Sequence, residues 1–222
     1  MTQYWDERFM KYLDKNTIKT IFEVGARYGD ESIQLSHFFN SSKVYSFECN
    51  PLTIDICRKN LVRYERIIFS DYGLGANNEE LPFYSYVKGN DGASSLFKRI
   101  DFAETQVQTG IIKTRKLVDF VSENNISQID LLCMDVQGYE LNVLKGSEEF
   151  IKHIKYIIME EPKPVINTQY LPEGFHSKYI NSPTPAEIHR FMEDNNFIVL
   201  ERLEENGLED NVLYKNTNTN AD

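Results

Sequence analysis

Acidic side chains stand at or near the ends of several short apolar runs in this sequence. Glu23 lies in TIFEV, Glu48 closes VYSFE, Asp71 follows RIIFS and Asp135 follows IDLLCM. If these runs are neighbouring parallel strands, their carboxyl ends meet at one edge of the sheet, where open α/β sheets bind ligands. Carboxylates at that edge accept hydrogen bonds from hydroxyl and amino groups and attract positive charge. The set predicts a site for a ligand that carries such groups.

The segment FEVGARYGDES supplies a ligand-binding turn after the first of these runs. Gly25 and Gly29 allow the backbone to turn sharply and to approach a ligand closely, and Asp30 is expected to cap the following helix. The segment lacks the G-x-G-x-x-G fingerprint and the phosphate-loop motif. Glu23 beside the turn would repel a pyrophosphate but suits the ammonium and sulfonium of S-adenosylmethionine. That cofactor is therefore expected, in contact with Glu23, Gly25, Tyr28 and Gly29.

Two further acids are assigned to other parts of the same cofactor. Glu48 follows Gly29 by 19 residues and is expected to accept hydrogen bonds from both ribose hydroxyls, as an acidic residue does in nicotinamide sites. Asp71 is expected to accept one from the adenine amino group. The alternatives are a solvated strand-end glutamate for Glu48 and an ordinary turn aspartate in SDYG for Asp71.

The elements that must position these residues follow an α/β order. Apolar runs and helical patterns alternate from residue 18 to about residue 160, which predicts a parallel sheet. Strands are expected at 20–24, 43–48, 66–70, 129–134 and 156–159, with helices at 30–39, from 51, and at 117–124, 139–150 and 186–195. The run LPFYSYV predicts an extra strand or hairpin arm. FIVLERL and NVLYK close the chain as a hairpin, so one of these two strands must run antiparallel to the others.

The length of 222 residues fits one compact domain. We expect that domain to span residues 1–215, with an N-terminal amphipathic helix within 1–16 and a polar, disordered tail over 216–222. Residues 161–185 contain five prolines and no clear periodicity. A loop this long inside a small domain is more often functional than idle, so it is expected to contact the substrate.

The composition excludes several classes of protein. The formal charge of −10 argues against a nucleic-acid-binding surface. No apolar stretch approaches the length needed to cross a bilayer, and the N-terminus lacks the pattern of a signal peptide. The three cysteines show no C-x-x-C spacing, which indicates free thiols rather than a disulfide framework or a zinc site. A cytoplasmic location follows as the expectation, without membrane or nucleic-acid partners.

The run IDLLCMDVQGYELNVLKGSEEFI resembles the FkbM-type methyltransferase motif D-L-[IL]-K-[IM]-D-[VI]-[EQ]-G-x-E-x-x-[VL]-L-x-G. Asp135, Gln137, Gly138, Glu140 and Gly146 are in register with it. EVGARYGDES and VYSFECNP also resemble segments of that family, and the resemblance covers roughly residues 18 to 160. It implies a Rossmann-like class I methyltransferase fold: a seven-stranded, mostly parallel sheet with a terminal antiparallel hairpin and helices on both faces. It also implies O-methylation, often of a sugar or polyketide hydroxyl, with a glycan or small molecule as the acceptor.

The sequence departs from this family pattern at a few positions. Arg27 replaces an asparagine or small residue in the glycine turn, which is expected to alter contacts to the methionine end of the cofactor. Cys133 replaces a common lysine, close to the expected substrate pocket, and Asn50 precedes Pro51 in a slightly altered FE-x-x-P. None of these changes removes the acids on which cofactor binding depends.

Transfer of a methyl group to a hydroxyl requires a group that takes the hydroxyl proton. Asp135 is the leading candidate, and its alternative roles are to hold the cofactor's ammonium or to cap the helix beginning near Gly138. Glu160 and Glu161 point to opposite faces if their strand persists, so at most one faces the cleft, and Glu160 is the further candidate. His176 in the proline-rich loop is another candidate base, with a solvated loop histidine as its alternative. Asp135, Glu160 and Glu161 also offer oxygen ligands to Mg²⁺. The sequence lacks a closely spaced Asp-Asp pair, so no metal requirement is expected.

Two other classes of function remain as alternatives. A nicotinamide-dependent oxidoreductase is disfavoured by Glu23, by the missing G-x-G-x-x-G and by the terminal hairpin. A non-catalytic binding module built on a cofactor fold is the second alternative, and the departures at Arg27 and Cys133 are what favour it.

Overall fold

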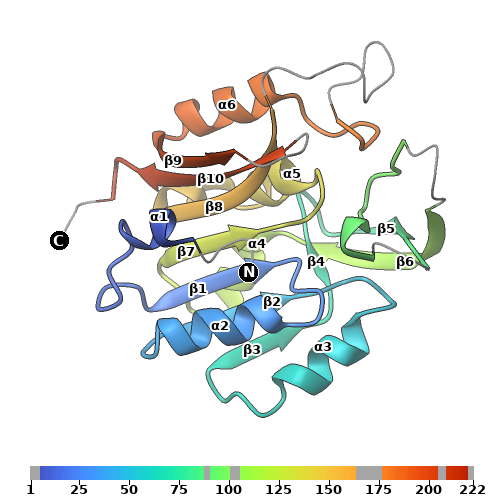
Figure 1. Ribbon diagram of the computed structural model, residues 1–222, viewed down its shortest axis with the longest axis horizontal. Helices are drawn as coiled ribbons and strands as arrows, with labels where there is room; N and C mark the ends of the chain where they lie inside the picture. The colour runs from blue at the N-terminus through green and yellow to red at the C-terminus, as the bar shows by residue number, and fades with distance from the viewer. Residues whose placement is uncertain (1–5, 88–90, 101–105, 164–176, 205–208, 220–222) are drawn as a thin grey trace.

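The computed structural model describes residues 6–87, 91–100, 106–163, 177–204 and 209–219, which form a layered α/β structure (Figure 1). Its main sheet has seven strands in the order β3-β2-β1-β7-β8-β10-β9. These are β1 (Thr20–Val24), β2 (Lys43–Phe47), β3 (Ile67–Ser70), β7 (Ile129–Met134), β8 (Ile154–Pro162), β9 (Phe197–Glu204) and β10 (Glu209–Asn216). The first five in spatial order pair in parallel, and β10 pairs antiparallel with both β8 and β9. The expected sheet with its terminal antiparallel hairpin is therefore confirmed.

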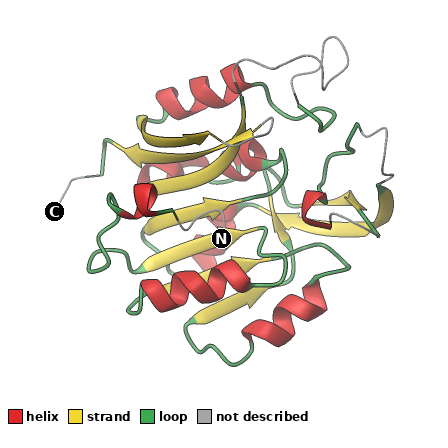
Figure 2. Ribbon diagram, viewed as in Figure 1, coloured by secondary structure: helices red, strands yellow, loops and turns green. Residues whose placement is uncertain are grey.

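Helices cover both faces of this sheet, as expected (Figure 2). On one face lie α1 (Glu7–Met10), α2 (Asp30–Phe38) and α3 (Ile54–Leu61), and on the other α4 (Leu117–Glu123), α5 (Glu140–Lys145) and α6 (Pro185–Asp194). Each set of helices packs its buried side chains against alternate residues of the strands, giving one apolar core per face. All six residues of β7 are buried, because helices cover this central strand on both sides. Each fully buried aliphatic side chain stabilises the fold by about 1.5–3 kcal/mol.

The strand order sets the position of a ligand site. The chain runs outward from β1 to β2 and β3, and then returns to place β7 on the other side of β1. The connections after β1 and β7 therefore leave the sheet in opposite directions, and a crevice forms between them at the carboxyl ends of the strands. Glu23, Glu48 and Asp135 line this crevice.

A second sheet of three strands, in the order β4-β6-β5, adjoins the carboxyl edge of the main sheet (Figure 1). It consists of β4 (Gly73–Leu74), β5 (Glu79–Ser85) and β6 (Val107–Arg115). The extra strand expected at LPFYSYV is part of β5. The partner strand β6 was not expected, because its apolar residues Val107 and Ile111 are 41% and 67% exposed and give no clear buried face. A short 3₁₀ helix, η1 (Asp91–Ala93), lies between β5 and β6.

Several boundaries differ from those expected. Within the described part of residues 1–16, the expected N-terminal helix is a single turn, Glu7–Met10. Helix α5 ends at Lys145 and is followed by the 3₁₀ helix η2 (Glu148–His153). Between them the chain passes close to Gly75, where a Cβ on Gly146 would lie 2.0 Å from the Gly75 carbonyl oxygen. Strand β10 extends through Asn216, one residue into the expected tail, and the hydroxyl of Thr217 donates to the carbonyl of Asn196.

The proline-rich segment 161–185 is described only at its ends. Strand β8 continues through Pro162, and α6 begins at Pro185 behind a capping box formed by Thr184 and Glu187. Proline is well tolerated at the start of a helix, and the reciprocal Thr–Glu bonds satisfy its first amides. Residues 164–176 lie outside the described part of the chain, and the expected substrate loop is for the most part among them. Within the described ranges, no helix has both the length and the apolarity to cross a bilayer.

Candidate active site

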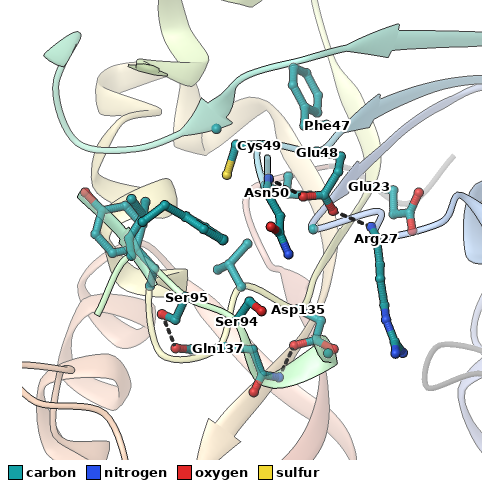
Figure 3. A pocket seen from close by; sticks show the side chains of 18 of the residues that line it. Glu23, Arg27, Phe47, Glu48, Cys49, Asn50, Ser94, Ser95, Asp135 and Gln137 are labelled. Carbon is teal, nitrogen blue, oxygen red and sulfur yellow. Dashed lines mark hydrogen bonds between the residues drawn. The ribbon is translucent and has the colours of Figure 1, made fainter. Parts of the chain in front are cut away.

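A cavity of about 380 Å³ lies at the carboxyl ends of β1, β2 and β7 and is closed on one side by the three-stranded sheet and η1 (Figure 3). Its volume is within the range of small-molecule sites. It is lined by Glu23, Val24, Gly25, Arg27, Tyr28, Asp30, Glu31, Phe47, Glu48, Cys49, Asn50, Gly73, Leu74, Phe83, Asp91, Gly92, Ser94, Ser95, Leu96, Asp135, Val136, Gln137 and Tyr139. The cavity therefore brings together five of the residues assigned to the site from sequence: Glu23, Gly25, Tyr28, Glu48 and Asp135.

The turn after β1, which contains Gly25, Arg27 and Tyr28, lines one side of this cavity. Gly25 has φ +93°, and a Cβ there would lie 2.0 Å from the carbonyl oxygen of Asp135, so only glycine allows the turn to approach the end of β7. The amides of Gly25 and Ala26 both donate to the carbonyl of Phe47 at 3.0 Å, which fixes the turn against β2. Gly29 does not line the cavity. It has φ +85° and occupies the N-cap of α2, the position expected for Asp30.

Glu48 projects into the cavity from the end of β2 (Figure 3). One carboxylate oxygen accepts a hydrogen bond from the backbone amide of Arg27, and the other accepts one from the amide of Asn50 at 2.6 Å. The side chain is only 6% exposed, and burial raises the pKa of Glu48 to about 7. The Thr53 hydroxyl and the Cys49 amide also interact with this carboxyl group and favour its ionised form. Because the group lines the cavity, it can also accept hydrogen bonds from hydroxyl groups of a ligand.

Glu23 lies beneath the turn and is 1% exposed. The hydroxyl of Ser32, in the first turn of α2, donates to it, and the hydroxyl of Ser46 lies 3.4 Å away. Burial raises the pKa of Glu23 to about 8, with the neighbouring carboxylates of Glu31 and Glu48 adding to the shift. The group therefore holds a proton at neutral pH unless a cation enters the cavity.

This protonation has a measurable effect on stability. The unfolded chain loses the proton of Glu23 above its ordinary pKa of 4.5, whereas the folded chain keeps it up to about 8. The contribution of Glu23 to the free energy of unfolding has its full value below pH 4.5, and it decreases as the pH rises from 4.5 to 8. In urea unfolding, we expect wild type to lose more than about 1 kcal/mol relative to Glu23→Gln between pH 5 and pH 8. Parallel pH profiles for the two proteins would contradict this assignment.

Asp135 belongs to a hydrogen-bonded cluster on the opposite wall (Figure 3). The side-chain amide of Gln137 donates to Asp135 and also, at 3.0 Å, to Glu160. The amide oxygen of Gln137 accepts a hydrogen bond from the Tyr179 hydroxyl, which fixes which end of the amide faces the two acids. The hydroxyl of Ser95 donates to the backbone carbonyl of Gln137 at 2.8 Å. One amide group thus holds two carboxyl groups close together.

Burial raises the pKa of both acids in this cluster, and the charge of Asp135 raises that of Glu160 further. Two carboxyl groups this close cannot both ionise at little cost, so one of them keeps a proton. Glu160 is the member that keeps it, because burial and the charge of Asp135 raise its pKa to about 10, whereas the charge of Arg27 lowers the pKa of Asp135. Asp135 is therefore the ionised acceptor that faces the cavity, while Glu160 stands behind it and does not line the cavity.

The remaining assigned residues are placed as follows. Asp71 is exposed, pairs with Arg58 at 2.7 Å and does not line the cavity. Glu161 points away from Glu160 and accepts hydrogen bonds from Arg202 and Tyr214 of the terminal hairpin, so only one of the two glutamates lies near the cleft, as expected. Cys133 is fully buried in the core and does not line the cavity. His176 lies outside the described residues.

An ion pair joins the glycine turn to η1 across the cavity. The guanidinium of Arg27 and the hydroxyl of Tyr28 both donate to Asp91. Arg27 has φ +49°, a conformation uncommon for a non-glycine residue, and its backbone amide is the one that donates to Glu48. Asp91 and Gln137 were not predicted as site residues. Asp91 is 64 residues from Arg27 in sequence and lies in no periodic pattern, whereas Gln137 stood in the recognised motif without an assigned role.

The charges of the lining residues decide which ligands fit. Six carboxyl groups line the cavity, from Glu23, Asp30, Glu31, Glu48, Asp91 and Asp135, against one cationic side chain, that of Arg27. Even with Glu23 protonated and Asp91 paired with Arg27, the lining keeps an excess of acidic groups. A pyrophosphate would meet repulsion in this setting, whereas a cation with hydroxyl groups would be attracted. Apolar side chains of Phe47, Leu74 and Phe83 line the part of the cavity nearer to β4 and β5 and offer a surface for a flat ring.

Comparisons with known proteins agree with this chemistry. A family model described as "Methyltransferase FkbM domain" matches residues 23–199. The 2-O-methyltransferase NoeI of Sinorhizobium fredii is 25% identical over 150 residues, which are 63% of this chain and 62% of that protein. The hexuronic acid methyltransferase AglP of Haloferax volcanii is 24% identical over 185 residues, which are 81% of this chain and 69% of that protein. The chain thus spans less than two thirds of the length of NoeI.

Solved structures with a similar fold include two cofactor complexes. Fibrillarin of Aeropyrum pernix, with natively bound S-adenosyl-L-methionine, has a TM-score of 0.53 at 10% identity and covers 91% of this chain and 68% of its own. TrmK of M. capricolum, in complex with S-adenosyl-homocysteine, has a TM-score of 0.51 at 11% identity and covers 97% of this chain and 70% of its own. At such identities the likeness shows the fold alone, which is that of the class I methyltransferases.

Proposed function

This chain belongs to the family of proteins with an FkbM methyltransferase domain, and from that premise we propose that it is an S-adenosylmethionine-dependent O-methyltransferase. The acceptor that we propose is a hydroxyl group of a sugar, a glycan or a related small molecule. The observation that carries the proposal is the cavity at the carboxyl ends of β1, β2 and β7, whose lining is predominantly acidic and contains Glu48 at the end of β2.

The residues present suit this cofactor. Glu48 is held by two backbone amides and lines the cavity, where its carboxylate suits the two ribose hydroxyls. The turn at Gly25 allows the methionine end to approach the backbone, and the surrounding carboxyl groups suit its ammonium and the sulfonium. Phe47 and Leu74 offer apolar contact to the adenine ring, in a region of the cavity that Asp71 does not reach.

When bound, the cofactor supplies a methyl group that is already activated by the positive charge on sulfur. The tasks left to the chain are to orient the acceptor hydroxyl and to accept its proton. Asp135 performs the second task in this proposal, because its carboxylate faces the cavity and receives a hydrogen bond from Gln137 that keeps it in place. Glu160 retains its own proton, and through Gln137 it is held beside Asp135 as a neutral neighbour.

The sugar acceptor is proposed from the relatives. NoeI is named as a 2-O-methyltransferase, which supports a hydroxyl as the acceptor group, and AglP is named as a hexuronic acid methyltransferase, which supports a sugar. The three cysteines are all free thiols, which is consistent with a reducing compartment, and we propose a cytoplasmic location.

The proposal is tested by supplying S-adenosylmethionine with a ¹³C-labelled methyl group together with panels of neutral and uronic oligosaccharides. The expected product is an O-methyl ether, identified by the chemical shift of its labelled carbon. We expect the same yield with EDTA as with added Mg²⁺, because the proton acceptor is a carboxylate of the chain. A labelled methyl on nitrogen or sulfur, from acceptors that carry those groups, would contradict O-methylation.

A further inference from the structure

A second hollow, of about 700 Å³, lies at the opposite edge of the main sheet, on the side of the molecule where the C-terminus is seen (Figure 1). It runs along the amino-terminal ends of β1, β2 and β8, and we refer to it as the amino-edge groove. Its lining consists of Tyr12, Asp14, Thr17, Lys19, Thr20, Lys43, Tyr45, Asn124, Asn125, Ile126, Ser127, Gln128, Asp130, Lys155, Tyr156, Lys215 and Thr219. None of these residues belongs to the cofactor cavity.

Four lysines line the amino-edge groove. Lys43 begins β2, Lys19 immediately precedes β1, Lys155 lies in β8 and Lys215 lies in β10. The strand order β2-β1-β7-β8-β10 spreads them over four strand intervals, which is about 19 Å at about 4.8 Å per interval. The result is a row of positive charges along one edge of a chain whose formal net charge is −10.

The two aspartates in the groove offset only part of this row, because Asp130 pairs with Lys155 and four lysines face two aspartates. Asp130 is 4% exposed, and one of its oxygens accepts hydrogen bonds from the backbone amides of Lys19 and Thr20. Its other oxygen accepts one from Gln128 at 2.6 Å and lies 3.8 Å from the ammonium of Lys155. Asp14 accepts a hydrogen bond from the backbone amide two residues later.

The ammonium groups at the two ends of the row remain available. Across the described ranges of the chain, no hydrogen bond or ion pair to a protein group occupies the ammonium of Lys43 or of Lys215. Lys215 is half-buried, so its charge is less well hydrated than that of a fully exposed lysine. Anionic groups are therefore the ligands that these ends of the groove would bind.

The uncharged side chains that line the groove indicate which class of anionic ligand fits it. Tyr12 and Tyr156 are half-buried and line the groove, and the Lys11 ammonium lies 4.7 Å from the centroid of the Tyr12 ring. The amides of Asn125 and Gln128 supply hydrogen-bond donors and acceptors. Sugar rings have apolar C–H faces bordered by hydroxyl groups, so rings and amides together match them. The single aliphatic residue of the lining is Ile126, and a membrane surface would find no exposed apolar side chain here to insert.

We propose that the amino-edge groove binds an acidic carbohydrate chain, with carboxylate, sulfate or phosphate groups on Lys43 and Lys215 and sugar rings on the tyrosines. The groove lies at the far edge of the sheet from the cofactor cavity, so this binding does not depend on methyl transfer. The groove would hold an acidic glycan on the protein at a site separate from the cofactor cavity.

The test is calorimetric titration at low salt with hexagalacturonic acid and with the neutral maltohexaose. We expect the acidic oligomer to bind and the neutral one not to, and we expect the affinity to fall as salt is added. Lys43→Gln/Lys215→Gln should weaken binding by about tenfold or more, as the loss of two charge-assisted hydrogen bonds predicts. The matched control is Lys59→Gln/Lys145→Gln, which removes the same charge from helices α3 and α5 and should leave affinity within about twofold.

Equal weakening in the two double variants would show a non-specific effect of net charge and overturn the proposal. Tighter binding to phosphatidylserine vesicles than to the oligomer would replace it with a membrane surface. Titration of S-adenosylhomocysteine into the same samples reports separately on the cofactor cavity. Retained cofactor binding with no oligomer binding refutes the groove alone, whereas oligomer binding without cofactor binding refutes the proposed methyltransferase alone.

Discussion

Replacing Glu48 with glutamine is expected to weaken binding of S-adenosylhomocysteine at least about tenfold, because a charged hydrogen-bond acceptor is worth about 1.5–3 kcal/mol. The wild-type carboxylate is held by the amides of Arg27 and Asn50 and lines the cavity. A glutamine has only one oxygen, so its NH₂ group would face one of these two amide donors. The change therefore removes an acceptor for the ribose and disturbs the glycine turn.

The pH dependence of binding gives an independent check on the same residue. Burial raises the pKa of Glu48 to about 7, so the carboxylate that accepts ribose hydroxyls forms as the pH rises through that value. Affinity for S-adenosylhomocysteine is expected to increase between pH 6 and pH 8 in the wild type. In Glu48→Gln this part of the pH dependence should disappear, as calorimetry at both pH values would measure.

Asp71→Asn is the matched control for Glu48, since both acids end neighbouring parallel strands. Asp71 is exposed, pairs with Arg58 and does not line the cavity, so the substitution should change affinity by less than about twofold. A loss in Asp71→Asn as large as that in Glu48→Gln would contradict the position of the cavity and restore the role in adenine binding that the sequence analysis gave to Asp71.

Replacing Asp135 with asparagine is expected to lower kcat by about 10²–10⁴, the usual contribution of a positioned general base. Asparagine matches the size of aspartate and can still accept a hydrogen bond from Gln137, but it cannot take a proton from an acceptor hydroxyl. The affinity for S-adenosylhomocysteine should change much less than kcat. Initial rates of methyl transfer, together with calorimetry on the same protein, separate the two effects.

Glu160→Gln is the matched control for this prediction. Glu160 already holds a proton at neutral pH because of burial and the charge of Asp135, so glutamine resembles the form that is present. We expect this variant to keep most of its activity. If Asp135→Asn instead lost cofactor affinity and kept kcat, Asp135 would be a ligand of the cofactor's ammonium. If Glu160→Gln lost as much activity as Asp135→Asn, Glu160 would share the work of accepting the proton.

The main sheet was predictable because it depends on local patterns, and so were those site residues that lie at or just after the ends of its strands. Short apolar runs separated by helical patterns define β1, β2 and β7, and an acid at the end of such a run must reach the ligand edge of a parallel sheet. Glu48 illustrates this. The same reasoning does not place Asp71, because beyond β3 the chain enters β4, and Gly73 and Leu74 form the cavity wall there.

The rest of the site depends on contacts that sequence spacing does not record. Asp91 reaches Arg27 because η1 and the three-stranded sheet lie over the cavity. Strand β6 of that sheet exposes Val107 and Ile111, so its sequence does not show the alternation of apolar and polar residues that indicates a strand. Gln137 acquires its role from Glu160 and Tyr179, which lie on β8 and just before α6. Such tertiary contacts override local propensity, and they determine which of the candidate acids lie close together.

The most direct test of the central claim is calorimetric titration of the unmodified chain with S-adenosylhomocysteine and, separately, with NAD⁺. An acidic cavity with Glu48 at its ribose position predicts micromolar binding of S-adenosylhomocysteine, about −8 kcal/mol, and no measurable heat with NAD⁺. Binding of NAD⁺ in preference would assign the cavity to a nicotinamide enzyme. The absence of heat with both ligands would contradict the methyltransferase account and favour a binding module that has kept the fold without its cofactor.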